Sequence, residues 1–193
     1  MTTDNAERRD YQDSSGARNG QRRMYLMFGA MILTSTAVMF LLTYTNAFSI
    51  DHVRWSEERF YMALLMGSAM AIIMLLFMRA MMYRNLKVNI AIIVAALVIG
   101  VSALGLSRSQ VLVDDVAYMD GMIPHHSIAI LTSMRANIDD LRVRELADGI
   151  IQAQEDEIAE MKWLIEDIAV NGKATTQEDA DQRPVPDFSL DTP

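Results

Sequence analysis

The chain of 193 residues contains no cysteine. It can therefore form no disulfide and no thiolate metal site, and it has no cysteine nucleophile. A soft metal ion could be held only by methionine or histidine side chains. The sequence has sixteen methionines but only three histidines, so candidate soft ligands are numerous while candidate imidazole ligands are few.

Three long stretches lack Asp, Glu and Lys altogether: residues 24–48, 60–83 and 88–106. Their one charge, Arg79, lies near the end of the second stretch, where a long side chain can reach the membrane surface. Each stretch is long enough to cross a hydrocarbon core of about 30 Å at about 1.5 Å per residue. We therefore predict three transmembrane helices, with room left for only one small domain after them.

The distribution of Lys and Arg predicts the orientation of these helices. Basic residues collect before the first stretch and between the second and third, whereas Arg108 alone follows closely after the third. Because positively charged loops stay on the cytoplasmic side, the N-terminus is expected to be cytoplasmic. Everything after about residue 107 would then lie outside. In a bacterial inner membrane, this means the periplasm or the cell exterior.

Methionines in the second stretch recur every four residues, at positions 62, 66, 70, 74, 78 and 82. A row of methionine sulfur atoms along one helix could bind Cu(I) ions. However, each four-residue step advances about 40° beyond a full turn, so the row winds roughly 200° around the helix. Adaptable packing against lipid and neighbouring helices is the favoured interpretation.

The part after the membrane stretches is acidic. Residues 107–172 carry thirteen Asp or Glu side chains against five Lys or Arg, and residues 173–193 carry five against two. This charge repels nucleic acid and attracts cations. A metal ion is therefore an expected partner of this part, and nucleic acid is not. The lipid bilayer is the partner expected for the three transmembrane helices.

Helix signals in this acidic part predict a helical hairpin. Asp114 or Asp115 can cap a helix that runs to about residue 136, and Asp139 or Asp140 can cap a second that runs to about residue 170. Gly172 would end it. The short connection implies two antiparallel helices in residues 107–172. Residues 1–23 and 173–193 are polar and are expected to be disordered.

The second helix of the predicted hairpin places polar residues within an apolar stripe. At about 100° per residue, Gln154 and Glu157 fall on the same face as Leu146, Ile150 and Met161. A carboxylate buried on such a face is costly unless it is protonated, paired or bound to a metal. Glu157 is therefore expected to have a partner on the first helix.

The first helix offers candidates. Met119 lies on its apolar stripe, with Met122 and His126 beside it, while His125 is displaced by about 100°. Pro124 can kink this helix. Imidazole and thioether favour copper, whereas carboxylate oxygen keeps zinc and iron open. The predicted metal site comprises Met119, Met122, His125, His126, Gln154, Glu157 and Met161.

Other interpretations of these residues remain open. The methionines fit an ordinary helical core, and the His, Gln and Glu could form a buried hydrogen-bond cluster without metal, in a structural or regulatory module. Catalysis is disfavoured because no His follows a Glu at the Glu-x-x-His spacing of di-iron bundles. We therefore expect no enzyme. The third histidine, His52, is expected to be a solvated loop residue.

The hairpin resembles a known family. The matching residues are Asp115, Tyr118, Met122-Ile-Pro-His-His126 and Ala129, followed by Ala147, Ile150, Gln154, Glu157, Ile158, Met161, Trp163 and Leu164. They resemble the domain of unknown function 305 family over about residues 112–167. The resemblance does not extend to the membrane helices.

The resemblance implies a ferritin-like, often exported helical domain, and some members of the family are periplasmic copper-binding proteins. By position it points to Met122, His125, His126, Glu157 and Met161, together with Gln154. A ferritin-like bundle needs four helices, whereas this chain supplies one hairpin. A homodimer could complete the bundle and share a metal site, or the hairpin could lie against the membrane domain. The predicted class is all-α, with three transmembrane helices followed by a half-bundle hairpin.

Overall fold

The computed structural model describes residues 2–79 and 82–190, and all regular structure among them is helical, which confirms the all-α class. In chain order the elements are α1 (Thr2–Leu42), η1 (Ile50–His52), α2 (Glu57–Met78), α3 (Leu86–Ser109), α4 (Asp115–Arg135), α5 (Leu141–Asn171), α6 (Gln177–Gln182) and η2 (Phe188–Leu190). They form two compact units. The first contains α1, α2 and α3, and the second joins the segment from Leu42 to Arg59 with the elements from α4 onward.

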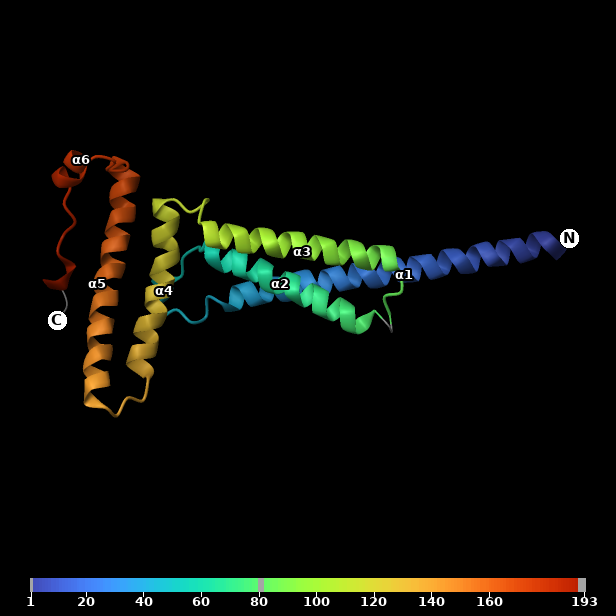
Figure 1. The fold of residues 1–193 in the computed structure, drawn as a ribbon, viewed down its shortest axis with the longest axis horizontal. Helices are drawn as coiled ribbons and strands as arrows, with labels where there is room; N and C mark the ends of the chain where they lie inside the picture. The colour runs from blue at the N-terminus through green and yellow to red at the C-terminus, as the bar shows by residue number, and fades with distance from the viewer. Residues whose placement is uncertain (1, 80–81, 191–193) are drawn as a thin grey trace. The chain divides into compact units, whose positions relative to one another are not determined.

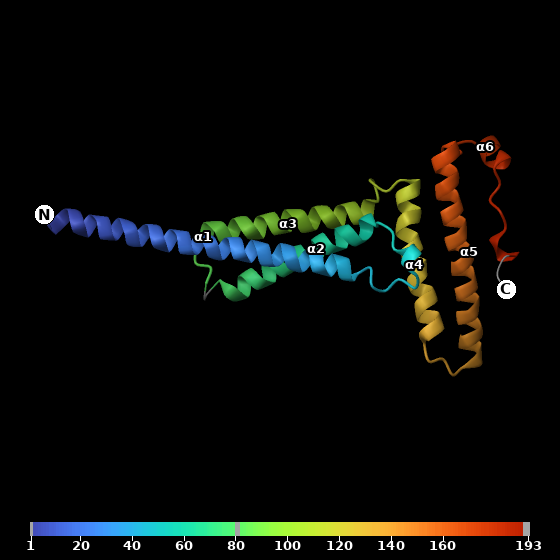
Figure 2. The same cartoon turned by 180° about the vertical axis from the view of Figure 1, so that it is seen from behind.

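Three helices of the first unit are long and apolar enough to cross a membrane, as the sequence predicted. The apolar stretches are Asn19–Leu42, Glu57–Met78 and Leu86–Ser109, with 24, 22 and 24 residues (Figure 2). The first was expected to continue to residue 48, but α1 ends at Leu42 and the following residues fold with the second unit. The predicted end of the second stretch extends over residues 80–81, which lie outside the described residues.

Small residues let the membrane helices approach one another closely. A Cβ atom added to Gly67 of α2 would lie 2.4 Å from Thr36 Oγ1 of α1. A Cβ atom added to Gly100 of α3 would lie 3.2 Å from the Cβ atom of Ser68. Apolar burial gives no driving force between helices in lipid, so close van der Waals contact at small residues helps to hold them together.

We expect Gly67→Leu to destabilise the membrane unit, because its side chain would occupy the space of the Thr36 hydroxyl. Overpacking of this kind costs about 1–3 kcal/mol. The matched control is Gly105→Leu on α3, where an added Cβ atom meets nothing within 4 Å. Thermal unfolding of the two full-length variants in detergent measures the difference. Equal melting temperatures would show that the contact at Gly67 is not a tight one.

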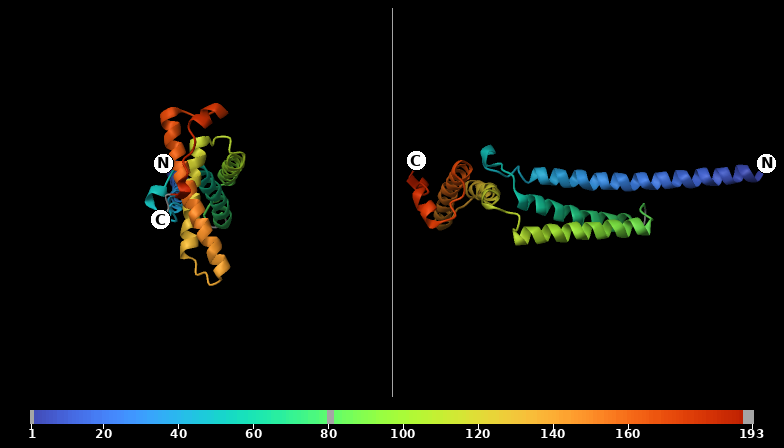
Figure 3. Two further views of the ribbon diagram at one scale, coloured as in Figure 1. Left: turned by 90° about the vertical axis from the view of Figure 1, so that its left-hand side faces the viewer. Right: turned by 90° about the horizontal axis from the view of Figure 1, so that it is seen from above.

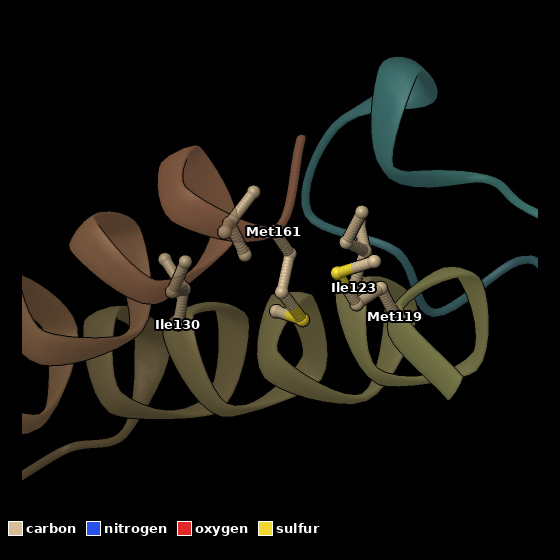
Figure 4. Close-up of a cluster of buried hydrophobic side chains, with 5 residues drawn as sticks. Met119, Ile123, Ile130 and Met161 are labelled. Atoms are coloured by element: carbon tan, nitrogen blue, oxygen red, sulfur yellow. The ribbon is translucent and has the colours of Figure 1, made fainter. Parts of the chain in front are cut away.

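The second unit is built on the predicted hairpin, with α4 and α5 side by side and antiparallel (Figure 1). Asp114 caps α4 by accepting from the Ala117 N–H at 2.9 Å, and Asp140 caps α5 by accepting from the Arg142 N–H at 2.9 Å. Gly172, with φ of 79°, ends α5 in a conformation that favours glycine. The core between the helices consists of Met119, Ile123, Ile130, Ile158 and Met161 (Figure 4).

Helical elements are present toward both ends of the described chain, and the disorder expected for residues 1–23 and 173–193 stays a prediction. Helix α1 is continuous from Thr2 (Figure 3). Its sequence contains no proline, and extending an existing helix costs less than starting a new one. In the tail, α6 and η2 follow α5, and the Arg183 guanidinium pairs with Asp167 and donates to the Gly172 carbonyl at 3.3 Å. These polar contacts join the tail to the end of α5.

Candidate functional site

A hollow of about 530 Å³ lies between α4 and α5. On α4, residues 115, 119, 122 and 126 line it, and this spacing repeats on one face of a helix. The lining residues are Asp115, Tyr118, Met119, Met122, His126, Glu157, Glu160, Met161, Leu164 and Ile168. The hollow therefore gathers five of the seven residues predicted from the sequence, together with three polar residues that were not predicted.

His126 and Glu157 form the polar centre of the hollow. The distance between His126 Nε2 and Glu157 Oε2 is 2.6 Å, and His126 Nδ1 lies 2.9 Å from the carbonyl oxygen of Met122. A carbonyl oxygen can only accept, so Nδ1 carries a proton and donates it. On the opposite side of the ring, the 2.6 Å between Nε2 and Glu157 Oε2 leaves room for one shared proton. A cation that replaced this proton would find both atoms already turned toward it.

The backbone bond also orients the imidazole. Metal-ligating histidines generally donate their second ring N–H to a carboxylate, a carbonyl or water, which holds the ring and its tautomer in place. The Met122 carbonyl has this role for His126, whose side chain is only 12% exposed. The ring is thus held with Nε2 toward the hollow before any ligand arrives.

The expected burial of Glu157 is wrong. Its side chain is 53% exposed, and Gln154 Nε2 donates to Glu157 Oε2 at 3.3 Å. The apolar stripe of α5 is also not buried along its whole length, because Leu146 is 63% exposed and Ile150 is 37% exposed. The buried face of α5 instead carries Ala147, Ile158 and Met161, with Ile151 packed against the core, so it lies one residue beyond Leu146, Ile150 and Glu157 around the helix. The carboxylate therefore avoids the cost of full desolvation and stays accessible from outside.

Three thioethers accompany this pair. Met119 and Met161 are 6% and 9% exposed, and Met122 is partly buried against the same core. The side chain of Met161 reaches from α5 toward α4 (Figure 4). These methionines fill the core and also line the hollow.

The two neighbouring histidines differ in position. His125 is exposed, does not line the hollow, and has its ring centre 6.2 Å from that of His126. Consecutive residues diverge by about 100° on a helix, so only one of them can face α5. The structure therefore does not bring His125 into the predicted cluster.

Sequence reasoning missed Asp115, Tyr118 and Glu160 as lining residues. Helical periodicity carried the signal for Asp115, which lies one turn before Met119 on the same face. Lys173 Nζ lies 2.5 Å from Asp115 Oδ2, and this hydrogen bond lowers the pKa of the Asp115 carboxyl group. The rim of the hollow thus has a negatively charged group that is already paired with an ammonium group.

The histidine and carboxylate ligands alone do not complete a metal site. In the described part of the chain, no three His, Asp or Glu side chains lie close enough together to hold a metal ion. A metal bound at His126 and Glu157 would therefore also need thioether, amide or external ligands. The methionines of the hollow and Gln154 could supply the first two, and a set of imidazole and thioether suits soft ions.

His52 is not the solvated loop residue that we expected. Its side chain is 12% exposed, and its Nδ1 atom lies 3.0 Å from Oγ of Ser127, a fully buried residue of α4. Burial lowers the pKa of His52 and nearby Lys162 lowers it further, while Asp51 opposes the shift. The neutral ring can then accept the Ser127 proton, and the backbone N–H of Phe48 donates to the same hydroxyl at 2.7 Å.

In the comparison with known proteins, the match to a protein family lies within the second unit. A family model described as "Domain of unknown function (DUF305)" matches residues 115–188. The chain is also similar to "Uncharacterized protein L153" of Acanthamoeba polyphaga mimivirus, with 33% identity over 154 residues that cover 76% of this chain and 99% of that protein. No solved structure matches the chain. The similarity to the viral protein therefore covers more of the chain than the hairpin alone.

Proposed function

We propose that this chain, which belongs to the DUF305 family, is a membrane-anchored metal-binding protein that captures or buffers a metal ion at His126 and Glu157. The observation that carries the proposal is the orientation of His126. Its Nδ1 proton is donated to the Met122 carbonyl, and its Nε2 atom is directed at a carboxylate oxygen. This is the arrangement in which a histidine ligand is held ready for a metal.

Copper is the proposed ion. The hollow combines one imidazole with the thioethers of Met119, Met122 and Met161, and soft sulfur ligands favour Cu(I) over Mg(II) or Ca(II). The carboxylate keeps Cu(II), Zn(II) and iron as competitors. In this proposal His126 is the central ligand, Glu157 the second, and Gln154 orients the carboxylate.

The proposal includes delivery to the outer side of a membrane. The basic residues before the apolar stretch of α1 and between α2 and α3 support a cytoplasmic N-terminus and an extracytoplasmic hairpin, in a bacterial inner membrane.

The proposal also includes a homodimer. A second copy could supply the ligands missing from one hairpin and complete a four-helix bundle.

A structural or regulatory module is the second candidate function. It is favoured by the short His126–Glu157 bond, which Gln154 extends, and by the lack of a third His, Asp or Glu ligand among the described residues. In that function the hydrogen bonds among His126, Glu157 and Gln154 set the register of α4 against α5, and no metal takes part.

Titration of the full-length protein in detergent or nanodiscs separates the two functions. We expect about one equivalent of Cu(I) per chain to bind, and metal at about 100 times its Kd to raise the free energy of unfolding by about 2.7 kcal/mol. Cu(II) and Zn(II) are titrated in parallel, and the mass of the particle at each step gives the number of chains. Unchanged unfolding with all three ions would support the structural module instead.

A further inference from the structure

The segment from Leu42 to Arg59 is fastened to the hairpin by polar groups. Arg54 Nη1 lies 3.0 Å from Asp120 Oδ1, and Lys162 Nζ lies 2.5 Å from Asp51 Oδ2. Together with the bonds to Ser127, these contacts hold the segment against α4, where it passes beside the Met119 end of the core (Figure 4). The segment is therefore an ordered part of the second unit.

The apolar side chains of this segment are exposed. Ile50 is 90% exposed, Trp55 54% and Val53 44%. His52 and Arg54, on either side of Val53, are directed to the hairpin. Val53 follows the 3-10 turn η1 and has an extended backbone, in which successive side chains point to opposite sides. The inward side thus carries the polar contacts, and the outward side carries large apolar groups.

Chain length indicates what covers these apolar groups. The segment follows one membrane-spanning helix that ends at Leu42 and precedes the next, which begins at Glu57. Both ends of the segment are therefore at the bilayer surface. Val111 and Leu112, which are 72% and 64% exposed, follow the last span within three residues of Ser109. Three residues reach at most about 11 Å, so these two side chains stay near the headgroup layer.

We infer that the exposed apolar side chains of the segment, with Val111 and Leu112, insert into the headgroup region of the bilayer. The amphipathic ring of Trp55 suits that region, where tryptophan is enriched, and its Nε1 group donates to Glu57 at 3.0 Å. The segment from Leu42 to Arg59 is therefore held at the membrane surface. This inference is independent of whether the hollow binds a metal.

The absence of cysteine makes a direct test possible, because a single introduced cysteine can carry a nitroxide spin label. The test compares Ile50→Cys with Leu141→Cys, a position on α5 that is 83% exposed. Both full-length proteins are reconstituted in phosphatidylcholine vesicles. Power saturation then measures collisions of the label with oxygen, which enters lipid, and with a water-soluble nickel complex.

We expect the label at position 50 to show a several-fold higher ratio of oxygen to nickel collisions than the label at position 141. Equal ratios would overturn the inference, because the label would then lie in water. Shielding from both probes would also overturn it, because protein would then cover the segment. Trp163→Phe leaves Trp55 as the single tryptophan and avoids changing Ile50. Quenching of its fluorescence by lipids brominated near the headgroup is expected, and its absence would contradict the insertion.

Discussion

Replacing His126 with alanine is expected to lower the affinity for copper by more than about 100-fold. Loss of a group that only hydrogen-bonds a metal ligand costs about 10–100-fold, and loss of the ligand itself should cost more. The variant removes the Nε2 atom that faces Glu157 at 2.6 Å and leaves a carboxylate that is 53% exposed. The remaining thioethers cannot replace an imidazole that was already oriented by the Met122 carbonyl.

His125→Ala is the matched control for this change. It removes the same chemical group one residue earlier on the same helix, but the His125 ring is exposed and does not line the hollow. Affinity should therefore be close to that of the unchanged protein. Isothermal titration or competition with a chromophoric Cu(I) chelator measures both variants. If the two single variants lost affinity equally, the distinction drawn from the structure would be wrong, and full affinity in the double variant would rule out the site.

Ser127→Ala is expected to release the segment from Leu42 to Arg59 from the hairpin. The Ser127 hydroxyl is fully buried and bonds both the Phe48 N–H and His52 Nδ1. A buried group left without its partner costs about 1–3 kcal/mol. The Phe48 amide should therefore exchange its hydrogen roughly 5- to 150-fold faster.

Hydrogen exchange of the full-length protein, followed by mass spectrometry of the peptides around Phe48, measures this effect. Thr132→Ala on the same helix is the control, because the Thr132 hydroxyl bonds the carbonyls of Ile128 and Ala129 within α4 itself. Protection in the Ser127 variant equal to that in the control would show that the segment is held by its other contacts alone.

The helical hairpin could be predicted in detail because its signals are local. Asp114 and Asp140 act as caps through their own backbone neighbours, and Gly172 ends α5 at the expected position. The pairing of His126 with Glu157 could also be anticipated, since helical periodicity places each on the face toward the other helix. The exposure of Glu157 could not, because it depends on which side of α5 packs against α4, and Ile158 instead of Glu157 lies in the core.

The membrane helices illustrate the same division. Their number follows from the length of apolar sequence, yet the end of the first at Leu42 does not, because residues 43–48 contain no charged side chain that would mark the end of a membrane helix. The competing structure is the segment itself, whose Phe48 N–H bonds a serine 79 residues later in the chain. A bond between residues this far apart in the chain cannot be predicted from a local sequence pattern.

The sequence by itself determined that this protein has three apolar helices and an acidic hairpin without thiols, because hydrophobic length, charge and composition act on the chain locally. It also narrowed the candidate ligands to one cluster. Only the tertiary structure decided that His126, and not His125, lines the hollow, and moved His52 from solvent into a buried bond with Ser127, 75 residues away. These outcomes depend on which surfaces meet in space, and helical periodicity contains only the direction in which each side chain leaves its own helix.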